Sequence, residues 1–141
     1  MAALAKALPE ATVTLQQGLT ASEKEGKPIS GKYEIEDGAL QLSVYTTKGG
    51  KFTEVIVDHR SGAIKKTEPI TSGEDLNDAK EQNEAMGPAK TSLSDATARA
   101  ASANPGYIVV SVVPALKNSH PMAEIGLLKG ESMKEVEQNL D

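Results

Sequence analysis

Two stretches of the sequence share one pattern, and together they decide the fold that the sequence predicts. Residues 48–62 read KGGKFTEVIVDHRSG, and residues 129–141 read KGESMKEVEQNLD. When the lysines that open them are aligned, both contain Lys-Gly, two further residues, Phe52 or Met133, one residue, and then Glu-Val. The shift is 81 residues, and apolar positions upstream follow it as well. The pattern predicts two copies of one unit, in which a helix precedes a meander of strands.

The first copy is predicted to begin with a short helix. Apolar residues within 4–8 have the spacing of one helix face, and Pro9 ends that helix. From Thr12 onward apolar and polar residues alternate, which predicts a strand that runs to about Glu23.

Further strands are predicted up to Ile64, and turn residues separate them. Asp37-Gly38 is the strongest hairpin signal, because both residues tolerate the positive φ of a two-residue turn. The other turns fall at 25–28, 49–50 and 58–62, where Gly, Pro and Asp gather. This half is therefore predicted to be an antiparallel meander.

The second copy follows a polar boundary at 68–73. Ser72, with an acid three residues later, predicts a capping box for a mostly polar helix over 74–86. Ser92 predicts the start of a second helix, which carries an apolar stripe and ends at Asn104. Strands are then predicted over 107–113, 121–128 and 132–138. This copy lacks the Asp-x-x-Ser-Gly turn and is expected to form one strand fewer, ending at about Gln138.

The predicted class is α+β, with two helix-plus-antiparallel-meander repeats of the cystatin-like or β-lactamase-inhibitor-like kind. The expected organisation is a first repeat over 1–70, a polar helical connection over 71–91 and a degenerate second repeat over 92–141. Because neither repeat has all its parts, we expect them to pack as one unit that shares a sheet or a core.

Composition narrows the classes of function. The 141 residues carry a net charge of −5, which disfavours a nucleic-acid binder that must neutralise phosphates. There is no cysteine, so thiolate chemistry and zinc–thiolate sites are excluded. No apolar run is long enough to span a membrane, and the first residues do not form a signal peptide. The composition predicts either a cytosolic protein or the mature form of an exported one.

The region 52–64, which reads FTEVIVDHRSGAI, resembles the close of a PepSY domain, and residues 9–13, PEATV, resemble its helix-to-strand break. The resemblance covers residues 3–66, and 92–141 as a degenerate second copy. It implies a non-enzymatic role outside the cytoplasm, periplasmic or secreted, either as a protein that inhibits or regulates a peptidase or as a binding module. PepSY domains occur in propeptides of thermolysin-type metallopeptidases, and the family has no catalytic residues or cofactors to transfer.

Direct candidates for chemistry are few. Asp58 and Ser61 are interpreted as turn residues, with the Asp58 carboxylate accepting backbone N–H groups and Gly62 taking positive φ. The histidines, His59 and His120, have no ligand-type residues at metal-binding spacing. No metal, cofactor or catalytic residue is therefore assigned.

The predicted binding surface is a polar sheet face that contains Thr46, Thr47, Lys51 and Thr53. An edge strand of that sheet could accept a peptide by strand addition. A run of acids over 74–84 is interpreted as a solvated helix face. The alternatives are a small-ligand carrier with a cavity between helix and sheet, and a structural or oligomerising envelope protein. The partner and the oligomeric state are left open.

Overall fold

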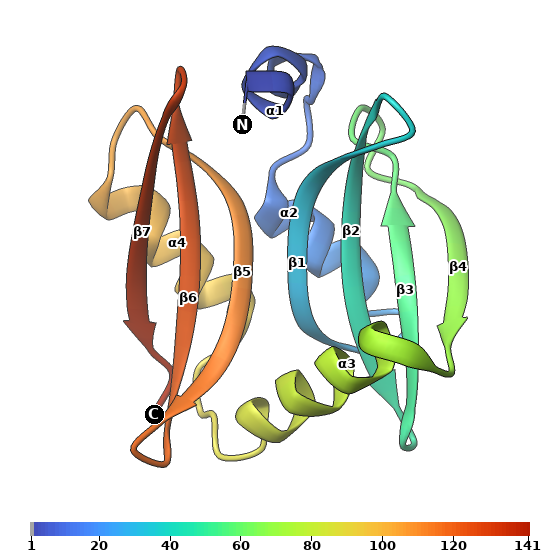
Figure 1. Ribbon diagram of the computed structural model, residues 1–141. Helices are drawn as coiled ribbons and strands as arrows, with labels where there is room; N and C mark the ends of the chain where they lie inside the picture. Colours follow the sequence, from blue (N-terminus) through green and yellow to red (C-terminus); the bar gives the residue numbers. More distant parts are fainter. Residues whose placement is uncertain (1) are drawn as a thin grey trace.

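The computed structural model describes residues 2–141, which fold into a seven-stranded antiparallel sheet with helices on both faces (Figure 1). The order across the sheet is β4-β3-β2-β1-β5-β6-β7. The helical segments are α1 (Ala2–Ala7), the 3-10 turn η1 (Leu8–Glu10), α2 (Leu15–Ser22), α3 (Gly73–Met86) and α4 (Leu93–Ala103). The strands are β1 (Lys27–Glu36), β2 (Ala39–Lys48), β3 (Lys51–Val57), β4 (Ile64–Ile70), β5 (Ile108–Lys117), β6 (His120–Lys129) and β7 (Ser132–Asn139).

The two halves of the sheet have matching strand positions. Strands β5, β6 and β7 each begin 81 residues after β1, β2 and β3, the same shift that relates Lys48 to Lys129. The turns match too, since Asp37-Gly38 and Asn118-Ser119 all have positive φ, as a two-residue hairpin turn requires. Strand β4 lies outside β3, whereas β7 forms the opposite edge of the sheet.

The halves meet where β1 and β5 form a short antiparallel pair. Gly31 pairs with Val112 and Lys32 with Ser111, whereas β1 and β2 are paired along most of their length. The two strands curve away from each other on either side of this contact (Figure 1). Each strand also has a register shift at the same place, between Pro28 and Ser30 in β1 and between Val109 and Ser111 in β5. These irregularities bend both strands, so the contact between the half-sheets is short.

The main core lies on the back face of the sheet, which we define as the face covered by α2 and α4 (Figure 1). Leu15 and Leu19 of α2 pack there, and Gly31 of β1 leaves room for them, because a Cβ at position 31 would lie 3.1 Å from Leu19 Cδ2. The core is built mainly from aliphatic side chains that are fully buried, among them Leu15, Leu19, Ile29, Leu42, Val44, Val55, Val112, Ile125 and Leu127.

Helix α3 crosses the opposite, front face (Figure 1). It is mostly polar and buries a small set of residues, Ala79, Ala85 and Met86. It therefore covers part of the front face without closing it.

The strand predicted over 12–23 is wrong, because this segment forms helix α2. The Thr14 hydroxyl accepts a bond from Gln17 N at 3.1 Å, and Gln17 Oε1 accepts one from Thr14 N at 2.8 Å. This capping box starts a helix whose Leu15 and Leu19 are four residues apart and share one buried face. The alternation at 12–15 is therefore a cap followed by a helix turn.

The predicted helices, hairpin and last strand agree with the structure, apart from one helix cap and one strand end. The helix starting after Ser92 is confirmed, with the Ser92 hydroxyl accepting from Asp95 N at 3.1 Å. The helix over 74–86 is confirmed, but its predicted cap is wrong, because the Ser72 side chain makes no capping bond. The predicted hairpin at Asp37-Gly38 is confirmed. The last strand extends to Asn139, one residue beyond the predicted end.

The packing of α2 against β2 predicts that Gly18→Leu lowers the free energy of unfolding by about 1–3 kcal/mol. A Cβ at position 18 would lie 2.7 Å from Leu42 Cδ2, so a larger side chain must displace the helix from the sheet. Urea unfolding would measure the change. Thr20→Leu is the matched control, since Thr20 is an exposed residue of the same helix. Equal stability of the two variants would contradict the close packing.

Candidate binding cleft

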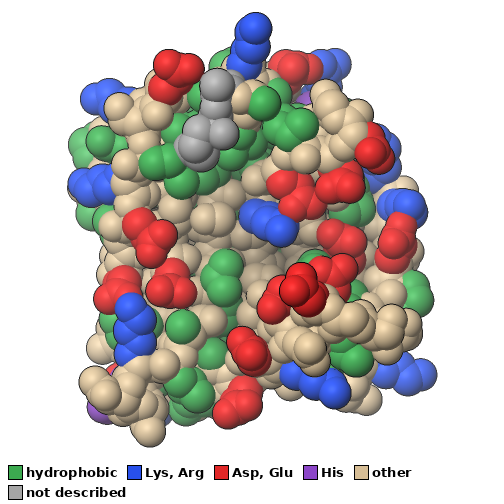
Figure 2. Space-filling view, viewed as in Figure 1, with side chains coloured by type: hydrophobic (Ala, Val, Ile, Leu, Met, Phe, Trp, Pro, Cys, Tyr) green, Lys and Arg blue, Asp and Glu red, His purple; other side chains and the backbone are tan. Residues whose placement is uncertain are grey.

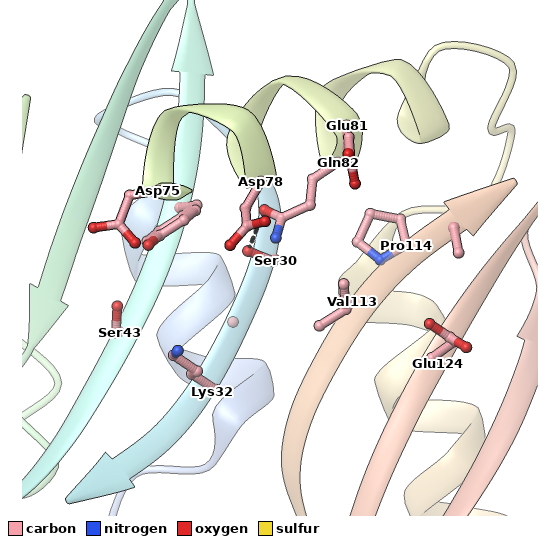
Figure 3. A pocket seen from close by; sticks show the side chains of 13 residues that line it. Ser30, Lys32, Ser43, Asp75, Asp78, Glu81, Gln82, Val113, Pro114 and Glu124 are labelled. Carbon is pink, nitrogen blue, oxygen red and sulfur yellow. Dashed lines mark hydrogen bonds between the residues drawn. The ribbon is translucent and has the colours of Figure 1, made fainter. Parts of the chain in front are cut away.

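A cleft of about 430 Å³ opens on the front face, between α3 and the junction of the half-sheets. Its floor is formed by the centres of β1, β2 and β5, and α3 forms one wall (Figure 3). The residues that line it are Ser30, Gly31, Lys32, Ser43, Tyr45, Asp75, Asp78, Glu81, Gln82, Val113, Pro114, Ala115 and Glu124. Both half-sheets and the helix between them therefore contribute to one site.

Hydrogen bonds hold the floor and the wall in place. Ser30 Oγ donates to Gln82 Oε1 at 2.7 Å, which ties β1 to α3 (Figure 3). Ser43 Oγ donates to Glu54 Oε2 at 2.6 Å and links β2 to β3 beneath the cleft. Both serines are buried, so these bonds satisfy polar groups that would otherwise be costly to bury.

Negative charge dominates the lining. Asp75, Asp78 and Glu81 come from α3, Glu124 comes from β6, and Lys32 is the cation among the lining residues. Acidic side chains are spread over this face of the molecule (Figure 2). Lys32 Nζ also lies 3.0 Å from Glu34, a carboxylate beside the cleft.

The pKa of Tyr45 is raised by this partly buried, acidic environment. Burial raises the pKa of its phenol, and the charge of Asp75 and a hydrogen bond with Asp75 raise that pKa further. The phenol therefore stays protonated at physiological pH beside the Asp75 carboxylate. A cleft with several carboxylates, a neutral phenol and a partly apolar floor is suited to hold a cationic group of a partner.

The structure separates the residues of the predicted polar face. Thr46 is 1% exposed and packs on the back face, where Thr53 lies opposite it in β3. Thr47, the next residue along β2, is directed to the front, and Lys51 is exposed in the hairpin at the start of β3. The four residues therefore do not form one exposed surface, because neighbouring residues of a strand point to opposite faces.

The sequence of α3 contains a local signal for the cleft. Asp75, Asp78 and Gln82 are spaced by three and four residues, so they share one face of α3. The acids over 74–84 are exposed, as predicted for a solvated helix face, and Asp75, Asp78 and Glu81 also border the cleft. Ser30, Ser43 and Tyr45 carry no local motif and come together only through strand pairing.

The turn at 58–62 has the structural role predicted for it. Asp58 Oδ1 accepts hydrogen bonds from Arg60 N at 2.8 Å and Ser61 N at 3.0 Å, and Gly62 has a φ of 79°. The carbonyl of His59 accepts bonds from Thr12 N and Val13 N at 2.8 and 3.0 Å. The turn thus also anchors the segment that leads into α2.

The two histidines occupy separate places. His59 lies in this turn, and His120 Nδ1 lies 3.1 Å from the side chain of Asp141. Within residues 2–141, no group of three or more His, Cys, Asp or Glu side chains has an arrangement that could hold a metal ion.

Comparisons with known proteins returned no match, whether to family models, to curated proteins or to solved structures. Among the described helices, none combines the length and apolar character needed to cross a membrane.

The Asp58 turn predicts a pH-dependent contribution to stability. The N–H of Ser61, and next that of Arg60, lower the pKa of Asp58. The carboxylate therefore stabilises the folded state above the pKa it has in the unfolded chain, and this contribution disappears as pH falls through the lowered value. Asp58→Ala should be less stable than wild type at pH 7, and the difference should narrow in acid. Denaturant unfolding from pH 7 to pH 2 measures this; a constant difference would contradict it.

Proposed function

We propose that this protein is a non-catalytic binding protein that holds a cationic part of a partner protein in the cleft beneath α3. The observation that carries the proposal is the cleft itself, whose lining includes four carboxylates from α3 and β6 and one lysine, although Glu124 also lies 3.7 Å from Lys117 Nζ. Fixed charges of one sign at the mouth of a surface cleft favour partners of the opposite sign and accelerate their encounter.

The nature of the cleft favours a binding module over a small-ligand carrier. A carrier is expected to enclose its ligand in a mostly apolar pocket. This cleft is open to solvent, and charged or hydroxyl-bearing side chains make up most of its lining. Such a site offers a protein partner direct access.

The resemblance to PepSY domains gives the proposal its biological setting. We infer a tandem arrangement, with 27–57 and 108–139 as equivalent units, from the shared shift of 81 residues and the matching register shifts in β1 and β5. In this setting the protein acts outside the cytoplasm, and its partner is a peptidase that it inhibits or regulates. The cleft then lies at the junction of the two units, where neither alone would form it.

The charge of the cleft can be tested with a cationic probe. Wild-type protein should bind pentalysine, measured by isothermal titration calorimetry at low salt, and Asp75→Lys/Asp78→Lys should weaken that binding by about tenfold or more. Glu84→Lys/Glu74→Lys is the matched control, because it makes the same charge change on α3 at residues outside the cleft lining. Equal binding by both double variants would show that general negative charge, and not the cleft, attracts the probe.

The peptidase role has its own measurement. Thermolysin-type metallopeptidase activity is followed with a chromogenic peptide while wild-type protein is added in excess. We expect hydrolysis to slow, and the Asp75→Lys/Asp78→Lys variant to slow it less. Unchanged hydrolysis at saturating protein would remove the support for peptidase inhibition and leave the cationic binding result unaffected.

A further inference from the structure

Among residues 2–141, no strand pairs with the outer edge of β7, at the position where the first half carries another strand. Strand β3 pairs with β2 on one side and with β4 on the other. Strand β7 begins 81 residues after β3 and pairs with β6, and it is the last strand of the sheet formed by residues 2–141. The first half thus shows, within the same molecule, how a strand fits against such an edge.

The register of β7 determines which backbone groups face outward. Ser132 closes the two-residue hairpin opposite Lys129, and beyond the end of β7 the Leu140 N–H donates to Pro121 O at 2.9 Å. Because bonded and non-bonded pairs alternate in an antiparallel ladder, the even-numbered residues of β7 bond to β6. The N–H and C=O groups of the odd-numbered residues therefore point away from the sheet; these are Met133, Glu135, Glu137 and Asn139.

The opposite edge of the sheet is protected. In β4 the same alternation directs Thr67 and Pro69 outward, and proline has no N–H to offer an added strand. The pairing of β3 with β4 also shifts register between Ile56 and Val57. Strand β7 contains no proline, and its pairing with β6 runs without a register shift from Ser132 to Asn139. Of the two edges, β7 is the one that can accept a strand.

The charge along β7 indicates which strand would fit. Glu137 lies directly opposite Glu124, a residue of the cleft, so Glu135 and Glu137 project on the front face. Lys117 forms an ion pair with Glu137, and no ion pair of Glu135 occurs among residues 2–141. In the first half the counterpart of Glu135 is Glu54, and β4 places Glu68 directly opposite it. Lys66 of β4 lies on the same face and forms an ion pair with Glu68, which is the main cause of the raised pKa of Lys66, and Glu54 contributes.

Pairing of β7 with a second copy of itself is disfavoured. In a two-fold antiparallel pair, outward-facing residues must lie opposite one another. In every register with substantial overlap, one pair of like charges then lies directly opposite across the two copies. This pair is Glu135 with Glu135, Glu135 with Glu137, Glu137 with Glu137, or Lys134 with Lys134. Like charges directly opposite destabilise a strand pair unless a cation lies between them, as Lys117 does for Glu124 and Glu137, so a different, basic strand fits better.

We propose that β7 binds an extended segment of a partner protein by strand addition, and that alternate side chains of this segment are Lys or Arg. The outward N–H and C=O groups supply main-chain hydrogen bonds, and Glu135 with Glu137 selects basic side chains on the front face. This interaction is independent of the cleft, and either site can bind without the other.

The probe for this edge is the synthetic peptide acetyl-TKVKVKT-amide, with acetyl-TEVEVET-amide as the acidic counterpart. Wild-type protein should bind the basic peptide, and NMR amide exchange should show new protection of the N–H groups of Glu135 and Glu137. The acidic peptide should bind about tenfold more weakly or not at all.

The variant Glu135→Pro removes an outward N–H but leaves the bonds between β7 and β6 in place, because proline is tolerated where the N–H faces solvent. It should keep the wild-type circular dichroism spectrum and lose about tenfold or more in affinity for the basic peptide. Thr67→Pro is the matched control on the protected edge and should bind as wild type does. Glu135→Gln should weaken binding less than Glu135→Pro, since it removes the charge alone.

Three results would overturn the proposal. One is the absence of binding of the basic peptide to wild-type protein. Another is equal affinity of the Glu135→Pro and Thr67→Pro variants, with amide protection confined to the cleft. The third is a dimer in sedimentation velocity whose formation protects the β7 amides without peptide, which would assign the edge to self-association.

Discussion

The contact between β1 and β5 is the constraint on which the rest of the structure depends. Gly31 faces Val112 there, and the two strands diverge on either side of it. Because Gly31 has no side chain, Leu15 and Leu19 of α2 can pack against the sheet at this point. A short contact alone would make a weak junction, so the elements that cross it must support it. Helices α2 and α4 support it from the back, and α3 supports it from the front (Figure 1).

The same geometry creates the cleft. Since β1 and β5 bend away from each other, a polar helix laid across the front of the sheet cannot fill the space beneath it. The Ser30–Gln82 hydrogen bond fixes α3 at one point, and Asp75 and Asp78 then stand over the floor of the sheet. The fold thus concentrates the acids of α3 at the junction of the two halves, next to Glu124 of β6.

Several elements were predictable from local sequence because local physics decides them. The two-residue hairpin turn requires residues that tolerate positive φ, and Asp37-Gly38 supplies them. Ser92 caps α4, and Asp58 closes the 58–62 turn by accepting hydrogen bonds from neighbouring N–H groups. The segment 12–23 was not predicted correctly because its alternating residues also suit a helix cap. The choice between strand and helix there depends on the capping box of Thr14 with Gln17 and on the burial of Leu15 and Leu19 beneath the sheet.

The sequence by itself determined the α+β class, the antiparallel meanders and the shift of 81 residues between corresponding strands, because spacing and turn chemistry are properties of neighbouring residues. Tertiary structure alone decided that both halves join in one sheet, that Thr46 is buried while Thr47 faces the front, and that α3 covers a cleft. It also decided that β7 is an edge while β3 is covered. These outcomes depend on pairing between residues far apart in the chain, and no local pattern specifies which strand lies beside which.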